Sequence, residues 1–141
     1  DSQICLAGVR RIGKKEHWLM QLSELCPSEP ALLLGEGSYG IVIKGCAYGI
    51  EMAVKLPKAE REHGEELTYP QLLRVQANEL RVLRSIRHPN IVCFHAAVLD
   101  PSSFQLGIVM ELVSGPTLDE FIRGLGKQPA CGKRLHIILR I

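Results

Sequence analysis

The 141-residue sequence lacks several features that would assign it to a broad class of protein. No stretch approaches the ~20 consecutive apolar residues of a membrane-spanning helix, and there is no secretory signal. The formal net charge is +2 with scattered Lys and Arg, so nothing indicates a nucleic acid or an anionic membrane as a partner. Hydrophobic residues make up 46% and charged residues 23%, which excludes disordered and collagen-like classes and suits about one globular domain.

The cysteines form neither a zinc pattern nor an even disulfide set. There are five of them, at Cys5, Cys26, Cys46, Cys93 and Cys131. Because no Cys-x-x-Cys pair and no suitably spaced His accompany them, reduced thiols in an intracellular, cytoplasmic protein are expected. Cys46 and Cys93 lie inside apolar runs, where a small buried hydrophobe is the expected role.

The two ends of the sequence predict a fragment of a longer protein. The chain begins at Asp1 and stops inside the apolar run 135–141, without the Gly, Pro or polar cap that commonly ends a helix. Residues 1–30 resemble nothing recognisable. Trp18, Leu19, Leu22 and Leu25 fit one face of a short helix, which residues 26–30 would end.

From residue 31 onwards the pattern predicts an α+β fold with a five-stranded antiparallel sheet. Runs rich in β-branched residues, bounded by turn-forming residues, indicate the strands. We expect them at residues 31–34, 41–46, 50–56, 91–98 and 104–112. Thr68 and Gln71 have capping-box spacing and predict the main helix, which should end near Ile86. Thr117 and Glu120 predict a short helix over residues 118–123, followed by the truncated helix.

A glycine-rich turn joins the first two predicted strands. It reads Gly35-Glu36-Gly37-Ser38-Tyr39-Gly40, which matches G-x-G-x-x-G. The dinucleotide-binding version of this motif needs a helix after the glycines, and a β-branched run follows here instead. A Walker A loop would need Gly-Lys-Ser/Thr, which is absent. The alternatives that remain are a plain tight turn and a flap whose backbone N–H groups close over phosphates.

Two charged residues in apolar surroundings favour the phosphate interpretation. Val42 extends the motif to G-x-G-x-x-G-x-V, and Lys55 follows Ala53-Val54 near the end of the next strand. On the helix, Glu79 falls within the apolar stripe Leu72, Val75, Leu83 and Ile86. A carboxylate there is costly to bury unless a cation meets it, and Lys55 is the natural partner. Alternatively, Glu79 lies at the edge of the stripe and reaches water.

Together these motifs resemble the small lobe of a protein kinase. In kinase order the chain carries the glycine loop through Val42, the Ala53-Val54-Lys55 strand, Glu79 within residues 78–83, and Arg-His-Pro-Asn-Ile-Val at residues 87–92. The resemblance covers about residues 31–141. Within the family, the detailed motif sequences are similar to those of mixed-lineage and Raf-like kinases of the tyrosine-kinase-like group. It implies an N-terminal extension at residues 1–30, a small lobe with its hinge at 31–113, and the start of a large lobe at 114–141.

The resemblance also implies roles for individual residues. Lys55 and Glu79 would be the catalytic ion pair that positions the ATP phosphates, beneath the glycine loop. Val42 and Ala53 would cover the adenine ring, Met110 would be the gatekeeper, and backbone groups of Glu111 and Val113 would hydrogen-bond the adenine. Leu83 and Phe94 would belong to the packing column of active kinases. Residues 58–67 lengthen the path from Lys55 to the helix, and Pro116 replaces a residue that is often glycine.

The expected activity of the parent protein is transfer of the γ-phosphoryl group of ATP to a protein hydroxyl, of the Ser/Thr type. ATP, Mg²⁺ and a protein substrate are therefore the expected partners. The catalytic Asp of H-R-D and the magnesium-binding Asp of D-F-G would lie beyond Ile141, so no metal ligand is expected in these residues and the fragment alone should be inactive. The alternatives are a pseudokinase, or a regulatory or interaction module in which the glycine turn is incidental.

Overall fold

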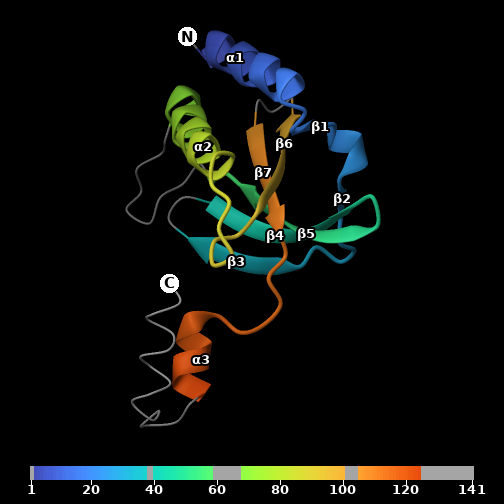
Figure 1. Cartoon of the computed structure of the whole chain (residues 1–141), viewed down its shortest axis with the longest axis vertical. Helices are drawn as coiled ribbons and strands as arrows, with labels where there is room; N and C mark the ends of the chain where they lie inside the picture. Colours follow the sequence, from blue (N-terminus) through green and yellow to red (C-terminus); the bar gives the residue numbers. More distant parts are fainter. Residues whose placement is uncertain (1, 38–39, 59–67, 101–104, 125–141) are drawn as a thin grey trace.

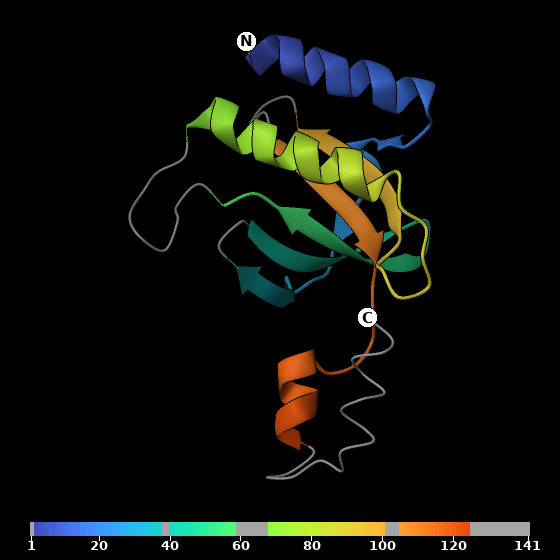
Figure 2. The same cartoon turned by 60° about the vertical axis from the view of Figure 1, so that its left-hand side comes forward.

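The computed structural model of the chain describes residues 2–37, 40–58, 68–100 and 105–124. Its centre is a mixed sheet of seven strands in the order β1-β6-β7-β5-β4-β2, with β3 also paired to β4. The strands are β1 Leu19–Met20, β2 Cys26–Pro27, β3 Leu33–Gly37, β4 Gly40–Ala47, β5 Ile50–Leu56, β6 Phe94–Asp100 and β7 Gln105–Glu111. Helix α2 (Tyr69–Leu83) packs on the sheet, and helix α1 (Ser2–Lys15) lies beside α2 (Figures 1 and 2).

The predicted α+β class is confirmed, and each of the five predicted strands has a counterpart among β3 to β7. These five pair antiparallel throughout. The expectation of five strands is nevertheless incomplete, because two short strands from the N-terminal residues extend the sheet. β1 pairs parallel with β6, and β2 pairs antiparallel with β4 beyond the end of β3. Runs of two residues are too short for an alternation of apolar and polar side chains to be visible in the sequence.

The short helix predicted around residues 18–25 is wrong. The N-terminal helix is α1, and residues 22–24 form a single 3₁₀ turn, η1 (Leu22–Glu24). The apolar spacing that suggested a helix has another cause: Trp18 is buried in the core, Leu19 belongs to β1, and Leu22 is half exposed. These apolar residues therefore have separate roles, and their helical spacing does not reflect a helix.

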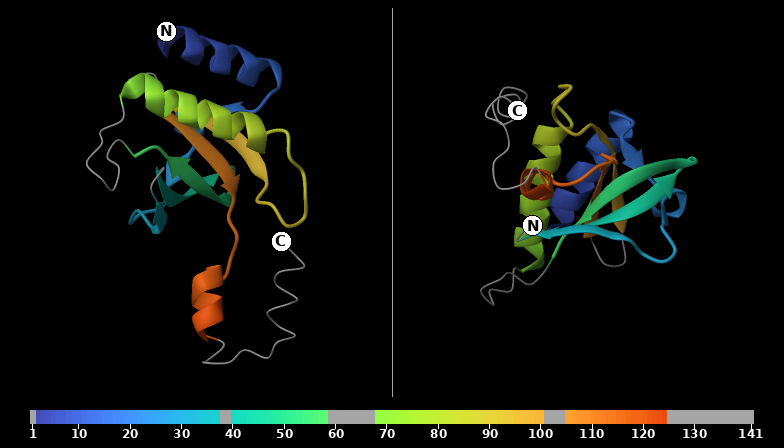
Figure 3. Two further views of the ribbon diagram at one scale, coloured as in Figure 1. Left: turned by 90° about the vertical axis from the view of Figure 1, so that its left-hand side faces the viewer. Right: turned by 90° about the horizontal axis from the view of Figure 1, so that it is seen from below.

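The local signals in the rest of the chain produce the predicted turns and caps. At the start of α2 the Thr68 N–H donates to Gln71 Oε1 at 2.9 Å, as a capping box requires. Tyr48 and Gly49 both have positive φ, at 54° and 77°, and form a two-residue hairpin between β4 and β5. Thr117 and Glu120 cap α3 (Leu118–Gly124), which lies apart from the sheet (Figure 3). The predicted helix after α3 lies outside the described residues.

Apolar side chains pack on both faces of the sheet. The cluster between the sheet and the helices holds Trp18, Leu73, Leu80, Phe94, Ala97, Leu106, Ile108 and Met110. The cluster on the other face holds Ala47, Met52, Val54, Ala96, Val98 and Val109. No helix in the described part of the chain is long and apolar enough to cross a membrane. The first cluster matters for the site, because it packs α2 against β6 and β7, and β7 pairs with β5, the strand that carries Lys55.

Candidate functional site

Lys55 on β5 and Glu79 on α2 form an ion pair. The Lys55 ammonium donates to both carboxylate oxygens of Glu79, at 2.6 Å to Oε1 and 2.8 Å to Oε2. The two side chains are 24% and 28% exposed. A pair at this depth is neither a loose surface contact nor a desolvated buried one, so solvent and a ligand can both reach it.

Glu79 lies at the edge of the buried face of α2. The residues of α2 that are buried are Leu73, Gln76 and Leu80, while the predicted stripe at Leu72, Val75, Glu79 and Leu83 is only partly buried. The predicted face is therefore displaced by one residue, or about 100° around the helix. Glu79 stands where the apolar face meets solvent, so the two alternatives left open by the sequence, pairing and hydration, both hold.

Gln76 is a buried polar residue that the sequence did not identify as important. It is 6% exposed, and its side-chain amide donates to the backbone carbonyl of Leu106 on β7. A buried amide without a partner would be costly, so this bond ties α2 to one position over the sheet. The sequence does contain a sign of this burial, because Gln76 lies between Leu73 and Leu80 at helical spacing.

The sheet register brings several of the predicted site residues to one face. Val42 lies opposite Lys55 across β4 and β5, and Ala53 lies opposite Met110 across β5 and β7. Because side chains alternate along a strand, Val42, Ala53, Lys55 and Met110 all project to the face that carries α2. Ala53 and Met110 are buried, while Val42 and Lys55 are partly exposed. The face therefore continues from the core to an open, partly charged edge.

Of the glycine turn, the structure describes residues 35–37 and Gly40, and Gly40 lies beside this edge, whereas Ser38 and Tyr39 lie outside the described residues. At Gly40 an added Cβ would stand 2.2 Å from the carbonyl oxygen of Leu56, so the fold itself requires glycine there. The same point is 3.7 Å from Lys55 Cε, which puts the lysine stem directly beneath the turn. At Gly35 and Gly37 an added Cβ would meet nothing within 4 Å. Packing gives no reason for these two glycines.

Glu36 of the glycine turn is engaged in an ion pair of its own. Its carboxylate contacts the ammonium of Lys58, which follows β5. Both side chains are substantially exposed, so the pair adds little to stability. It links the turn to the residues after β5, a contact that the sequence did not predict.

The predicted hinge residues occupy the end of β7 and the segment after it. The Glu111 N–H donates to the Cys93 carbonyl at 3.0 Å, and Glu111 Oε1 accepts from the Cys93 N–H at 2.9 Å. The Glu111 side chain therefore holds the chain before β6 in place. Val113 is 65% exposed. Of the predicted packing column, Phe94 is buried beside Met110, and Leu83 packs on the same cluster.

The N-terminal segment contacts the same helix at its C-terminal end. Trp18 is buried, packs edge-on against Phe94 at 6.1 Å between ring centroids, and donates its indole N–H to Glu16 at 2.8 Å. Glu16 also contacts Arg84, the residue that caps α2. The hydrogen bonds from Trp18 and Arg84 lower the pKa of the Glu16 carboxyl below 4.5. Residues before position 30 thus bear on the helix that carries Glu79.

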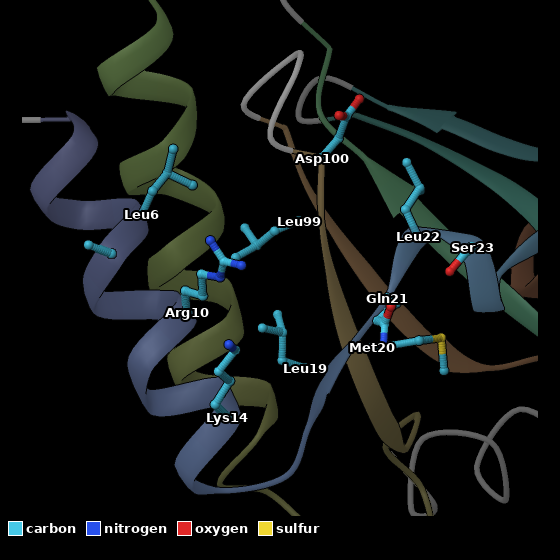
Figure 4. Close-up of a pocket in the computed structure, with 11 residues that line it drawn as sticks. Leu6, Arg10, Lys14, Leu19, Met20, Gln21, Leu22, Ser23, Leu99 and Asp100 are labelled. Carbon is cyan, nitrogen blue, oxygen red and sulfur yellow. The ribbon is translucent and has the colours of Figure 1, made fainter.

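A pocket of about 840 Å³ lies away from Lys55, between α1 and the segment of β1 and η1 (Figure 4). Leu6, Leu19 and Leu99 line its apolar part, and Arg10 and Lys14 reach toward it from α1. Its lining includes neither Lys55, Glu79 nor any residue of the glycine turn. It is therefore separate from the edge that the turn and the ion pair form.

Comparison with known proteins identifies the family. The protein kinase domain model matches residues 29–138. The chain is 33% identical over 111 residues to Dual specificity protein kinase zak2 of Dictyostelium discoideum, with 77% of this chain and 17% of that protein covered. It is 35% identical over 106 residues to RasGEF domain-containing serine/threonine-protein kinase X of the same organism, with 74% and 10% covered. It is 35% identical over 106 residues to Probable serine/threonine-protein kinase SIS8 of Arabidopsis thaliana, with 75% and 10% covered. The chain therefore spans a small part of the length of these relatives.

Proposed function

Because the chain belongs to the protein kinase domain family, we propose that it forms the ATP-binding part of an enzyme that phosphorylates protein hydroxyl groups. Relatives named as serine/threonine kinases favour Ser and Thr as the acceptors. The observation that carries the proposal is the bond of the Lys55 ammonium to both carboxylate oxygens of Glu79, beneath the glycine turn. The placement in the tyrosine-kinase-like group stays a prediction.

In this proposal Lys55 grips the phosphates of ATP. An ammonium group has three N–H donors, and Glu79 receives two of them at 2.6 and 2.8 Å. The carboxylate fixes the lysine and leaves a donor for an anionic ligand. Phosphoryl transfer depends on positioning and on electrostatic stabilisation, so a rigid cation at the α- and β-phosphates is the contribution a small lobe can make.

The glycine turn is proposed to cover the same phosphates. Gly35 and Gly37 lack a packing reason to be glycine, whereas a backbone that approaches a phosphate closely excludes a Cβ. The residues described at this edge, a cation and an open glycine backbone, therefore fit the triphosphate. Gly40 serves the fold first, because a Cβ there would strike the Leu56 carbonyl. Glu36, Ser38 and Tyr39 would contribute through their backbone groups.

The adenine base is proposed to lie on the apolar part of the face. Val42 and Ala53 would cover the ring, Met110 would be the gatekeeper at its rear, and Glu111 and Val113 would offer backbone hydrogen bonds. The register that puts Val42, Ala53 and Met110 on one face supports this arrangement. Since the Glu111 N–H is bonded to Cys93, its carbonyl is the group proposed to meet the adenine.

The 141 residues contain neither the H-R-D nor the D-F-G sequence. We therefore propose that this chain alone binds ATP weakly and transfers no phosphate, and that the Mg²⁺ ligands belong to other residues of the full-length protein. A calorimetric titration of ATP into the 141-residue chain should give an affinity weaker than micromolar. Micromolar binding, or phosphorylation of a generic substrate by the chain alone, would contradict this part of the proposal.

The decisive experiment replaces Lys55 in the full-length protein. Lys55→Met should lower phosphoryl transfer by about a hundredfold or more, the usual cost of losing a preorganised electrostatic contact. Lys44→Met is a matched control, because Lys44 is equally exposed at 25%, lies on the same face and also pairs with a glutamate, Glu51. Equal losses of phosphoryl transfer in Lys55→Met and Lys44→Met would contradict the role proposed for Lys55.

A pseudokinase is the second candidate, and retention of the turn, Lys55 and Glu79 argues against it. The same experiment separates the two, since a full-length protein that binds ATP without transferring phosphate would be a pseudokinase. An interaction module without a nucleotide would show no ATP binding, and Lys55→Met would then change nothing.

A further inference from the structure

Cys26 and Cys46 lie directly opposite each other on neighbouring strands. Cys26 is on β2 and Cys46 on β4, and the antiparallel register pairs them as it pairs Pro27 with Gly45. Directly opposed residues of an antiparallel pair project their side chains to the same face, with Cα atoms about 4.5 or 5.5 Å apart. A disulfide needs Cα atoms about 4.4–6.8 Å apart, so both types of pair fall within its range.

Both side chains are free thiols, and their exposure differs in a useful way. Cys26 is exposed, and Cys46 is partly buried. An exposed thiol can react with a small disulfide, and a sheltered thiol beside it can then resolve the mixed disulfide. Cys46 also lies opposite Glu51 of β5, whose carboxylate is paired with Lys44. Cys93 is also a free thiol, but it is partly buried and lies directly before β6, away from β2 and β4 in the strand order.

We propose that Cys26 and Cys46 form an oxidisable dithiol that a low-molecular-weight disulfide, such as oxidised glutathione, converts into a cross-strand disulfide. The Cys26 thiolate attacks one sulfur of the small disulfide and expels one small thiolate. The Cys46 thiolate then attacks the Cys26 sulfur of the mixed disulfide and expels the second. The two cysteines lose two protons and two electrons, and the small disulfide is reduced to two thiols.

The bond would close a ring of residues 26–46, which contains β3 and the whole glycine turn. β2 is two residues long and pairs only along the end of β4 that β3 leaves uncovered. A covalent link would replace this short pairing and would attach the N-terminal segment firmly to the strand that begins at the turn. The dithiol depends on strand register alone, so it stands whether or not the site binds ATP.

The test is peptide mapping of the 141-residue chain after incubation with oxidised glutathione. Trypsin separates the two cysteines, because cleavage after Lys15, Lys44 and Lys55 puts Cys26 on residues 16–44 and Cys46 on residues 45–55. We expect these two peptides to be joined, with the mass of two hydrogen atoms lost, and to separate when a reducing agent is added. A parallel incubation in urea should give several-fold less of this linkage, because unfolding removes the register.

Two variants complete the test. The triple variant C5S/C93S/C131S keeps only the proposed pair and should form the linkage as the unaltered chain does. Cys46→Ser should stop at a glutathione adduct on Cys26. A stable glutathione adduct on Cys26 in the unaltered folded chain, a dominant linkage through another cysteine, or equal yield in urea would each overturn the proposal.

Discussion

The edge proposed to bind ATP and the N-terminal segment contact the same helix in different ways. At the edge, α2 meets the sheet through Lys55 and Glu79, whose side chains are about a quarter exposed. On its buried face, α2 meets the N-terminal segment in an apolar cluster that includes Trp18, which is 8% exposed. The first contact is charged and partly open to solvent, while the second is mainly apolar, with one partly exposed ion pair, Glu16 with Arg84, beside it.

The comparison indicates that the contact with the N-terminal segment contributes more to stability, whereas the charged edge is the part proposed to bind the ligand. Removing apolar surface from water is the largest favourable contribution to folding, and Trp18 removes a large ring from water against Phe94. A partly exposed ion pair gains little, since water competes with each partner. The proposed nucleotide site would need that openness to bind and release its ligand. The helix is therefore held by its buried face, while Glu79 on the flank of that face stays accessible to solvent.

The largest predicted effect is that of Trp18→Ala on stability. Loss of this buried ring should lower the free energy of unfolding by about 3–5 kcal/mol, as is typical of large aromatic truncations in cores. Urea unfolding of the 141-residue chain, followed by circular dichroism, measures the change. The matched control is Leu22→Ala in the same segment, where the side chain is half exposed and the cost should stay near 0.5 kcal/mol or less. Similar costs in the two variants would mean that the segment is not part of the core.

The sequence predicted the edge better than the segment, for a physical reason. A glycine turn, Lys55 and Glu79 have strict chemical requirements, and their residue types and spacing remain visible along the chain. The N-terminal segment contributes two-residue strands and the buried indole ring of Trp18. These pack in the fold without producing a periodic pattern of apolar residues in the sequence. Gln76 is intermediate between the two regions, because only part of its role is visible in the sequence. Its spacing with Leu73 and Leu80 was visible, but its bond to the Leu106 carbonyl depends on tertiary contact.

A smaller effect is predicted at the edge itself. Glu79→Gln removes the charge that holds Lys55 but keeps the shape of the side chain, so unfolding should become easier by no more than about 1 kcal/mol. The neighbouring substitution Leu80→Ala, at a position 3% exposed, should cost about 2–5 kcal/mol. Urea unfolding of both variants makes the comparison within one turn of α2. A cost above about 2 kcal/mol for Glu79→Gln would show that the ion pair also carries the fold.

The smallest effect should come from pH at the contact between the segment and α2. The pKa of Glu16 is lowered from 4.5 by hydrogen bonds from Trp18 and Arg84. A carboxyl with a lowered folded pKa stabilises the fold above pH 4.5, and this contribution is lost as the pH falls through the lowered value. Trp18 is the single tryptophan, so its fluorescence reports the loss directly.

Glu16→Gln should therefore reduce the change of Trp18 fluorescence below pH 4.5, because its side chain no longer titrates. Glu24→Gln is the matched control. The pKa of Glu24 is also lowered, first by the Gln21 N–H and then by Tyr48, but these bonds do not involve Trp18. The control should keep the acid response of the unaltered chain. If both variants lost it equally, the response would belong to general unfolding, and the charge of Glu16 would have no separate part in holding the segment to α2.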